Sequence, residues 1–432
     1  MKDLNKSENK FLELIVFIII FFVSFFNIFT LITFFIYLFY KLFKEREIGA
    51  IKILNLLTIR QVLNPGIAVN FGVFESLKWI LIMLCSFLLI TTYNKLVFEE
   101  QKLFHKIFKW FLIFIIYTGI TSLIFSSFPM VALLKIIGYC IPFTGLLLGV
   151  IYTHNKFNWI TWLTNIFSVI TLFSIPLISN PVGYLRNGTS FQGLINHPNL
   201  FGVFLVLYIA LNLVNLQMLI ENNKSHLKYY FNIIIAILLI IATKSRTSLG
   251  SVIILLLIFI IFSRYALIKK LIFTCLTIIL ALISIPFIEN IINYFTNFFI
   301  KGADNIFQSR TNQIGTLLEA FLSNPFFGRG FSVPYAPIRS YILSTDLIVE
   351  PGNLFMAVLA YGGILGMIFF LIFLAAVITS NINGIKLFVF LPVSVVLICM
   401  GEMVFFSTNN IGIFCYMFFA IYCAKGIIYL EE

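Results

Sequence analysis

The sequence predicts an all-α, polytopic membrane protein. Of its 432 residues 61% are hydrophobic and only 11% are charged, whereas about 25% of residues are charged in an average soluble domain. Apolar runs of about 20 residues, the length that crosses a bilayer as a helix, recur along the whole chain. We therefore expect about 12 to 14 transmembrane helices in one continuous bundle.

The net charge of +12 does not predict binding to nucleic acid. The lysines lie mainly in short hydrophilic stretches between apolar runs, as the positive-inside rule expects of cytoplasmic loops. The six cysteines all lie inside apolar runs without metal-ligand spacing. We expect them to be packing residues, and we expect neither a metal nor a cofactor.

The first part of the chain is the least regular. No small-residue cleavage site follows the apolar run at 11–40, so no removable signal peptide is predicted. Whether this run is one helix or a tight hairpin near Asn27 stays open. The charged residues 41–52 predict a cytoplasmic loop. The next run contains Arg60 and Asn64, which favours a broken helix lining a cavity, because polar groups at membrane depth need partners inside the protein.

From residue 73 onward, apolar and hydrophilic stretches alternate regularly. Spans are predicted at 73–92, 110–125, 131–152, 159–178, 200–220, 229–242, 249–262, 271–287, 353–379, 387–406 and 411–424. The basic stretch 95–109 predicts a cytoplasmic loop. The stretch 179–196 is rich in Gly, Asn, Ser and Pro, which predicts an external loop. This order of crossings places residues 244–248 and 286–352 on the outer side.

Residues 286–352 are the only long stretch that apolar runs do not dominate. Apolar residues recur at helical spacing at 288–299 and at 314–322, which predicts two amphipathic helices at the membrane interface. Asn324 and Pro325 should end the second helix. We expect a small, partly embedded external lid. The chain then divides into N-terminal transmembrane helices (1–190), core helices (191–285), the lid (286–352) and C-terminal transmembrane helices (353–432).

Five arginines are predicted to lie on the external side: Arg186, Arg246, Arg310, Arg329 and Arg339. Guanidinium suits bidentate recognition of phosphate and does not lose its charge, so this cluster predicts an anionic ligand. The alternative for each arginine is a salt bridge to a nearby carboxylate or contact with lipid headgroups. Arg246 is the strongest candidate, because Ser245 or Thr247 can cap a helix starting there and a helix N-terminus itself attracts anions.

His197 is the histidine that the predicted topology places outside, in the sequence Asn196-His197-Pro198-Asn199 at the start of a span. Asn196 can cap that helix, and proline is tolerated in the first turn. A lone histidine in such a turn is more often a structural donor than a catalyst. Because no second external His or Cys accompanies it, no zinc site is predicted.

Four short motifs follow one another between residues 191 and 366. They are FQGLINHPNLFG at 191–202, Ser245-Arg246-Thr247, Arg310 followed by NPFFGRG at 324–330, and Gly352-Asn353 followed by Gly362, Gly363 and Gly366. In this order they resemble the His-Pro-Asn, Ser-Arg, Asn-Pro-x-x-Gly-x-Gly and His-Asn motifs of the O-antigen ligase and Wzy polymerase superfamily. Residues 1–190 are similar to that family only in their hydrophobic layout.

The resemblance implies a membrane-embedded glycosyltransferase of the GT-C class. Such an enzyme moves glycan from undecaprenyl diphosphate at the external face without a nucleotide sugar or a metal. Arginines matching Arg246 and Arg310 are expected to hold the diphosphate and to act in catalysis. The residues expected to contact substrate are Arg186, His197, Asn199, Ser245, Arg329, Arg339 and Asn353.

The chain departs from the family at Gly352, where many ligases carry a histidine. The nearest titratable group is Glu350, which we expect to act as the general base for the acceptor hydroxyl. The alternative is that Glu350 forms a salt bridge with Arg310 or Arg329. The missing histidine favours a polymerase over a ligase.

We therefore expect a capsule, exopolysaccharide or O-antigen repeat-unit polymerase in the bacterial cytoplasmic membrane, with its active site facing outside. Its partners would be the undecaprenyl-diphosphate-linked donor and acceptor, membrane lipids, a chain-length regulator and a flippase. The alternatives are a polysaccharide ligase, a lipid-linked oligosaccharide flippase or transporter, and a membrane scaffold without catalytic activity. Transporters often show internal repeats, and no clear repeat is present in the sequence.

Overall fold

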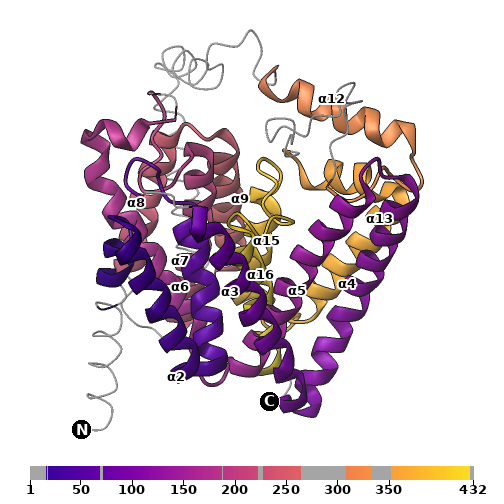
Figure 1. Cartoon of the computed structure of the whole chain (residues 1–432), viewed down its shortest axis with the longest axis horizontal. Coiled ribbons are helices and arrows are strands. Elements are labelled where there is room, and N and C mark those ends of the chain that lie inside the picture. Colours follow the sequence, from indigo (N-terminus) through magenta and orange to yellow (C-terminus); the bar gives the residue numbers. More distant parts are fainter. Residues whose placement is uncertain are drawn as a thin grey trace.

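The computed structural model describes residues 16, 18–68, 72–186, 188–221, 227–263, 308–332 and 352–428. Nearly all of these residues are helical (Figure 1). The long helices are α2 (Ile28–Gln61), α3 (Gly72–Ile90), α4 (Phe98–Phe125), α5 (Pro129–Thr153), α6 (Trp159–Ser174), α7 (Pro198–Glu221), α8 (Leu227–Thr243), α9 (Arg246–Phe262), α12 (Gln308–Ser323), α13 (Leu354–Thr379) and α16 (Gly412–Ile428). Shorter elements are η1 (Thr91–Lys95), η2 (Ile175–Ser179), η3 (Pro181–Tyr184), α14 (Ile385–Phe388) and α15 (Phe390–Ile398).

The helices confirm the predicted all-α polytopic membrane fold. Within the described ranges, six helices are long and apolar enough to cross a membrane, and three shorter apolar helices accompany them. Large apolar side chains remain exposed on the outer surface of the bundle, among them Ile124, Leu134 and Phe231. A soluble protein rarely exposes so many, whereas lipid provides them with an apolar solvent.

Helix α7 is the central helix of the bundle. It packs against α6, α8, α9 and α15. Of the residues in its most apolar stretch 83% are buried, against 39% for α4 and for α13. Its sequence is apolar on every face, which is the pattern of a helix without a solvent or lipid face. Helix α7 is therefore surrounded by other helices along most of its length.

The chain reverses direction twice in its first 61 residues. Asn27 caps α2, because its side chain accepts a hydrogen bond from the Thr30 N–H at 2.9 Å. Across this break the ring centroids of Phe21 and Phe34 lie 6.3 Å apart, so the described part of the run at 11–40 folds back as a hairpin. At Arg46, with φ 46°, α2 turns back on itself, and a Cβ on Gly49 would lie 2.5 Å from the Lys41 carbonyl oxygen. The predicted loop at 41–52 is thus a tight turn between two helical halves.

Two predicted boundaries are wrong. The expected loop at 95–109 is mostly the first turns of α4, which begins at Phe98, because Leu103, Phe104 and Ile107 form a buried stripe between charged residues. The expected span 387–406 breaks at Ile398, the end of α15. Residues 399–411, hereafter the α15–α16 loop, leave the helix near Gly401 and Glu402.

The predicted amphipathic helix at 314–322 is confirmed as part of α12, and Asn324-Pro325 follows its end. Figure 1 shows α12 lying across one end of the bundle, next to α13. The turn that follows α12 binds α13 through the backbone. The N–H groups of Arg329 and Gly330 donate to the carbonyls of Ala360 and Tyr361 at 2.8 and 3.0 Å. The predicted span 271–287 and the predicted helix 288–299 lie outside the described residues.

This docking requires glycine on both sides of the joint. Helix α13 is interrupted at Gly363, where φ is +62° and ψ is −161°, a conformation that is open essentially only to glycine. A Cβ on Gly363 would overlap the backbone of Phe326, and a Cβ on Gly328 would overlap the backbone of Tyr361. The glycines of the third and fourth motifs therefore allow the turn after α12 to dock on α13.

Candidate functional site

Three helix N-termini meet the α15–α16 loop at one end of the bundle. The Asn199 amide, in the first turn of α7, donates to Glu402 Oε1 at 2.7 Å. Gly401 lies against Thr247, in the first turn of α9, so closely that a Cβ on Gly401 would overlap that side chain. The Leu354 N–H, at the start of α13, donates to the Cys399 carbonyl at 2.8 Å. Three of the four motifs are thus joined through a loop that belongs to none of them.

The His-Pro-Asn turn begins α7. The His197 carbonyl accepts the first helical hydrogen bond, from the Phe201 N–H at 2.9 Å, and its ring Nδ1 accepts from the Asn199 N–H at 3.2 Å. His197, rather than the predicted Asn196, therefore caps the helix. The Asn196 N–H instead donates to the Val62 carbonyl at 2.8 Å, which fixes the turn to the end of α2. Pro198 occupies the first helical position, as predicted.

The Ser-Arg turn begins α9 at Arg246, and Ser245 occupies the N-cap position. Its hydroxyl lies 2.8 Å from the Ser248 hydroxyl and accepts no hydrogen bond from a backbone N–H of the first turn. Ser245 therefore occupies the predicted N-cap position without forming the predicted capping hydrogen bond. A Cβ on Gly202 would lie 2.6 Å from Ser248 Oγ. The glycine of the His-Pro-Asn-x-x-Gly motif therefore allows α7 and α9 to touch.

Asn353 caps α13, because its Oδ1 accepts from the Met356 N–H at 3.1 Å. Its Nδ2 lies 3.9 Å from the Met400 sulfur of the α15–α16 loop. Asn353, the residue after Gly352, thus caps a helix that begins beside the α15–α16 loop. Each of the three helix ends presents backbone N–H groups and the positive end of a helix dipole, which favour an anion.

The far end of the α15–α16 loop is fixed by a buried lysine. Lys78 of α3 donates to Gln61 Oε1 at 2.7 Å, to Glu75 Oε2 at 2.6 Å and to Asn409. The Thr408 hydroxyl donates to the Gly138 carbonyl of α5 at 2.7 Å. Non-helical backbone at membrane depth is tolerated where it is held by protein groups or lines a cavity. The α15–α16 loop is therefore held in place by hydrogen bonds to α3 and α5.

Glu402 is the residue that sequence reasoning missed. It falls inside the predicted span 387–406, whose apolar content hides it. The available signal was the charge itself, since an ionisable residue inside an apolar run is by default a candidate for function. Lys78, inside the predicted span 73–92, carried the same signal.

The other predicted site residues fall in different places. Arg186 is exposed, and its backbone N–H donates to Gln192 Oε1 at 2.8 Å. Arg329 is exposed at the joint of α12 and α13, where its Nε donates to Ser323 Oγ at 2.5 Å. The backbone of Arg310 lies in the first turn of α12. Arg339 and Glu350 lie outside the described residues. The structure thus brings together His197, Asn199, Ser245, Arg246 and Asn353.

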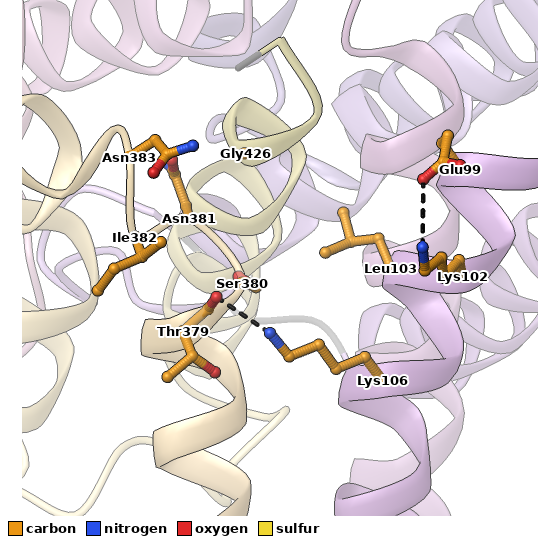
Figure 2. Close-up of a pocket in the computed structure, with 10 residues that line it drawn as sticks. All are labelled: Glu99, Lys102, Leu103, Lys106, Thr379, Ser380, Asn381, Ile382, Asn383 and Gly426. Atoms are coloured by element: carbon orange, nitrogen blue, oxygen red, sulfur yellow. Dashed lines mark hydrogen bonds and ion pairs between the residues drawn. The ribbon is translucent and has the colours of Figure 1, made fainter. Parts of the chain in front are cut away.

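A cavity of about 410 Å³ opens at the other end of α13 (Figure 2). Lys106 of α4 donates to the Thr379 carbonyl at 3.0 Å, and Lys102 lies 4.0 Å from Glu99. The segment of α13 from its interruption at Gly363 to Thr379 rises 16 residues, which at 1.5 Å per residue places this cavity about 24 Å from the interruption. The cavity therefore belongs to the opposite end of the bundle and not to the convergence of motifs.

A comparison with protein families finds the Wzy_C model, described as O-Antigen ligase, over residues 231–371. The matched range contains the Ser-Arg turn, α12 with the turn that follows it, and the Asn353 cap, while the His-Pro-Asn turn precedes it. A comparison with curated proteins finds no match. This match over residues 231–371 supports the resemblance to the O-antigen ligase and Wzy polymerase superfamily that the motifs predict.

Proposed function

We propose that this protein is a polysaccharide repeat-unit polymerase. It would transfer a growing glycan from undecaprenyl diphosphate to a lipid-linked repeat unit at the external face of the cytoplasmic membrane. The observation that carries the proposal is the meeting of three helix N-termini, with Arg246 and Glu402, at one end of the bundle. This arrangement places groups that can stabilise an anionic leaving group, namely the helix N-termini and Arg246, at the same end of the bundle as the carboxylate of Glu402.

Arg246 would stabilise the diphosphate as it leaves. Its side chain is half-buried in the first turn of α9, where the helix dipole adds to its charge. Preorganised charges in a site with little water stabilise a developing anion more strongly than they would in water. Arg310, in the first turn of the lid helix α12, would supply a second guanidinium to the same diphosphate.

The charge distribution supports an external site. Lysines gather at the end of the bundle opposite the convergence: the Lys95 ammonium lies 5.7 Å and the Lys156 ammonium 3.4 Å from the Tyr152 ring centroid, and Lys102 and Lys106 line the cavity of Figure 2. Lysine-rich ends face the cytoplasm under the positive-inside rule. The Asn199–Glu402 contact would then face outside.

The proposal is tested with purified protein in liposomes supplied only with purified lipid-linked repeat unit. A polymerase produces a ladder of chain lengths, since donor and acceptor are the same compound. Arg246→Ala should abolish the ladder while the protein still accumulates in the membrane. Lys228→Ala removes one positive charge from the exposed start of α8 and serves as the matched control, with an unchanged ladder. Wild-type chain length in Arg246→Ala would overturn the diphosphate role.

A ligase is the second candidate, because the matching family model is described as O-Antigen ligase. The same liposomes separate the two functions. A ligase leaves the repeat unit unextended until a different acceptor glycan is added, and it then produces a single transfer. Translocation of the lipid-linked unit without any new glycosidic bond would instead indicate a transporter.

A further inference from the structure

We propose that Glu402 is the catalytic base that takes the proton from the acceptor hydroxyl. This inference rests on the proposed glycosyl transfer and assigns to Glu402 the role for which the sequence offered Glu350. It is carried by the position of Glu402 in the α15–α16 loop, between the starts of α7, α9 and α13.

The backbone places Glu402 where the helix stops. Its N–H still donates to the Ile398 carbonyl at 3.0 Å, and its own carbonyl accepts from the Val404 N–H at 2.8 Å. The next four residues, 403–406, are all buried apolar side chains, whereas Glu402 itself is half-buried. A carboxylate kept among such neighbours costs stability, so its presence at this position calls for a functional reason.

The side chain is oriented by the His-Pro-Asn motif. The Asn199 amide donates to Oε1 at 2.7 Å, and Asn199 is itself held by the bond from its N–H to the His197 ring. A carboxylate can accept several hydrogen bonds on its two oxygens, and this bond fixes the orientation of the Glu402 side chain. Asn199 is a positioning residue in this scheme.

Other described titratable groups at this end have different partners or positions. Glu75 is paired with Lys78 at 2.6 Å. His197 uses Nδ1 to accept a backbone N–H, which in the neutral ring leaves a proton on Nε2. Glu319 lies exposed on α12. The charged group nearest to the loop contact on α9 is Arg246, beside Thr247, and it suits the diphosphate rather than the hydroxyl.

The step balances as follows. The acceptor oxygen forms a bond to the anomeric carbon of the donor, and the bond between that carbon and the phosphate oxygen breaks. The bonding electrons leave with the lipid diphosphate beside Arg246. The hydroxyl proton passes to the Glu402 carboxylate, which becomes a carboxylic acid and later releases the proton to water.

A purely structural role is the rival explanation, and glutamine separates the two. Glu402→Gln keeps an amide oxygen that can accept from Asn199, so it preserves the link between α7 and the loop while removing the base. Glu402→Asp keeps the base on a shorter side chain. Glu319→Gln is the matched control for the loss of an exposed carboxylate, and Glu350→Gln tests the base that the sequence favours.

Turnover and apparent KM for purified lipid-linked repeat unit are measured for each variant in liposomes, with thermal unfolding of each purified protein. General base catalysis contributes about 10²- to 10⁴-fold. Glu402→Gln should therefore lose at least about 100-fold in kcat with KM and unfolding temperature close to wild type. Glu402→Asp should keep measurable turnover, and Glu319→Gln should match wild type.

A Glu402→Gln protein with wild-type kcat would overturn the assignment, as would a loss of turnover confined to Glu350→Gln. If Glu402→Gln does not fold, Glu402→Asp decides: ladder synthesis supports the carboxylate, and a folded but inactive protein contradicts it. An inactive wild-type protein refutes the proposed function itself, whereas an active wild type with an active glutamine variant refutes only the role of Glu402.

Discussion

Two glycines determine how closely the turns that begin α7 and α9 approach their neighbours. Gly202 allows α7 to touch Ser248 of α9, and Gly401 allows the α15–α16 loop to touch Thr247. The first belongs to a recognisable motif, and the second follows no motif. Both act by the absence of a Cβ, so their importance lies in packing rather than in chemistry.

Gly401→Ala should therefore reduce activity without removing any functional group. The added methyl would overlap Thr247 and would displace Glu402, the next residue. Shifts of about 1 Å in a catalytic group can cost on the order of 100-fold in rate, and ladder synthesis in liposomes measures this loss. Adding Thr247→Gly, which removes the three atoms nearest to the new methyl, should restore part of the activity. A fully active single variant would show that the contact is not required.

The sequence predicted single residues well where a turn motif marked them. His197, Arg246 and Asn353 do stand at the starts of helices, because Pro198, Ser245 and the apolar runs behind them define those starts. The capping bonds were not predictable, since a histidine ring and a serine pair replaced the expected caps. Glu402 was missed because one charge hardly alters the hydropathy of a 20-residue window.

At the scale of elements, the joint between α12 and α13 fastens α12 to the membrane bundle. The freed backbone groups of α13 around Gly363 are used by the turn at 324–330, as in the bond from the Ile364 N–H to the Pro325 carbonyl at 2.8 Å. Phe331 is then buried beside Tyr361, and its N–H donates to Ser122 Oγ at 2.8 Å. The lid helix is thus fastened at its C-terminal end.

Gly363→Ala should weaken this joint. The strained backbone alone costs about 1–3 kcal/mol for a residue with a side chain, and the new Cβ would also overlap Phe326. We expect a lower unfolding temperature in detergent. Gly315→Ala on α12 is the control: nothing lies within 4 Å of its Cβ position, so alanine should raise helix stability by up to about 1 kcal/mol. Equal unfolding temperatures for the two variants would contradict the claim that the joint between α12 and α13 stabilises the protein.

The spacing of apolar residues predicted α12, but it could not predict where α12 docks. That docking depends on backbone groups exposed by a break in another helix, and hydrophobic periodicity carries no information about such a break. The same limit explains α15: its apolar run continues past Ile398, whereas the helix ends there because the loop bonds to α3, α5 and α13.

At the scale of the whole molecule, the bundle has two chemically different ends. One end gathers the motif turns and the α15–α16 loop, and the other gathers lysines around the cavity between α4 and the end of α13. The alternation of apolar runs predicted this separation. The convergence of α7, α9 and α13 was implied only by the family resemblance, because composition does not place distant helices beside one another.

The most direct test of the convergence as the substrate site is photo-crosslinking of a labelled undecaprenyl-diphosphate-linked repeat unit. A photoreactive amino acid replaces Met400, which is 39% exposed in the α15–α16 loop, or Ile382, which is 58% exposed beside the opposite cavity. The protein is reconstituted in liposomes and illuminated with the labelled donor. Labelling at position 400 and not at position 382 is the predicted result, and labelling at position 382 alone would contradict the proposed site.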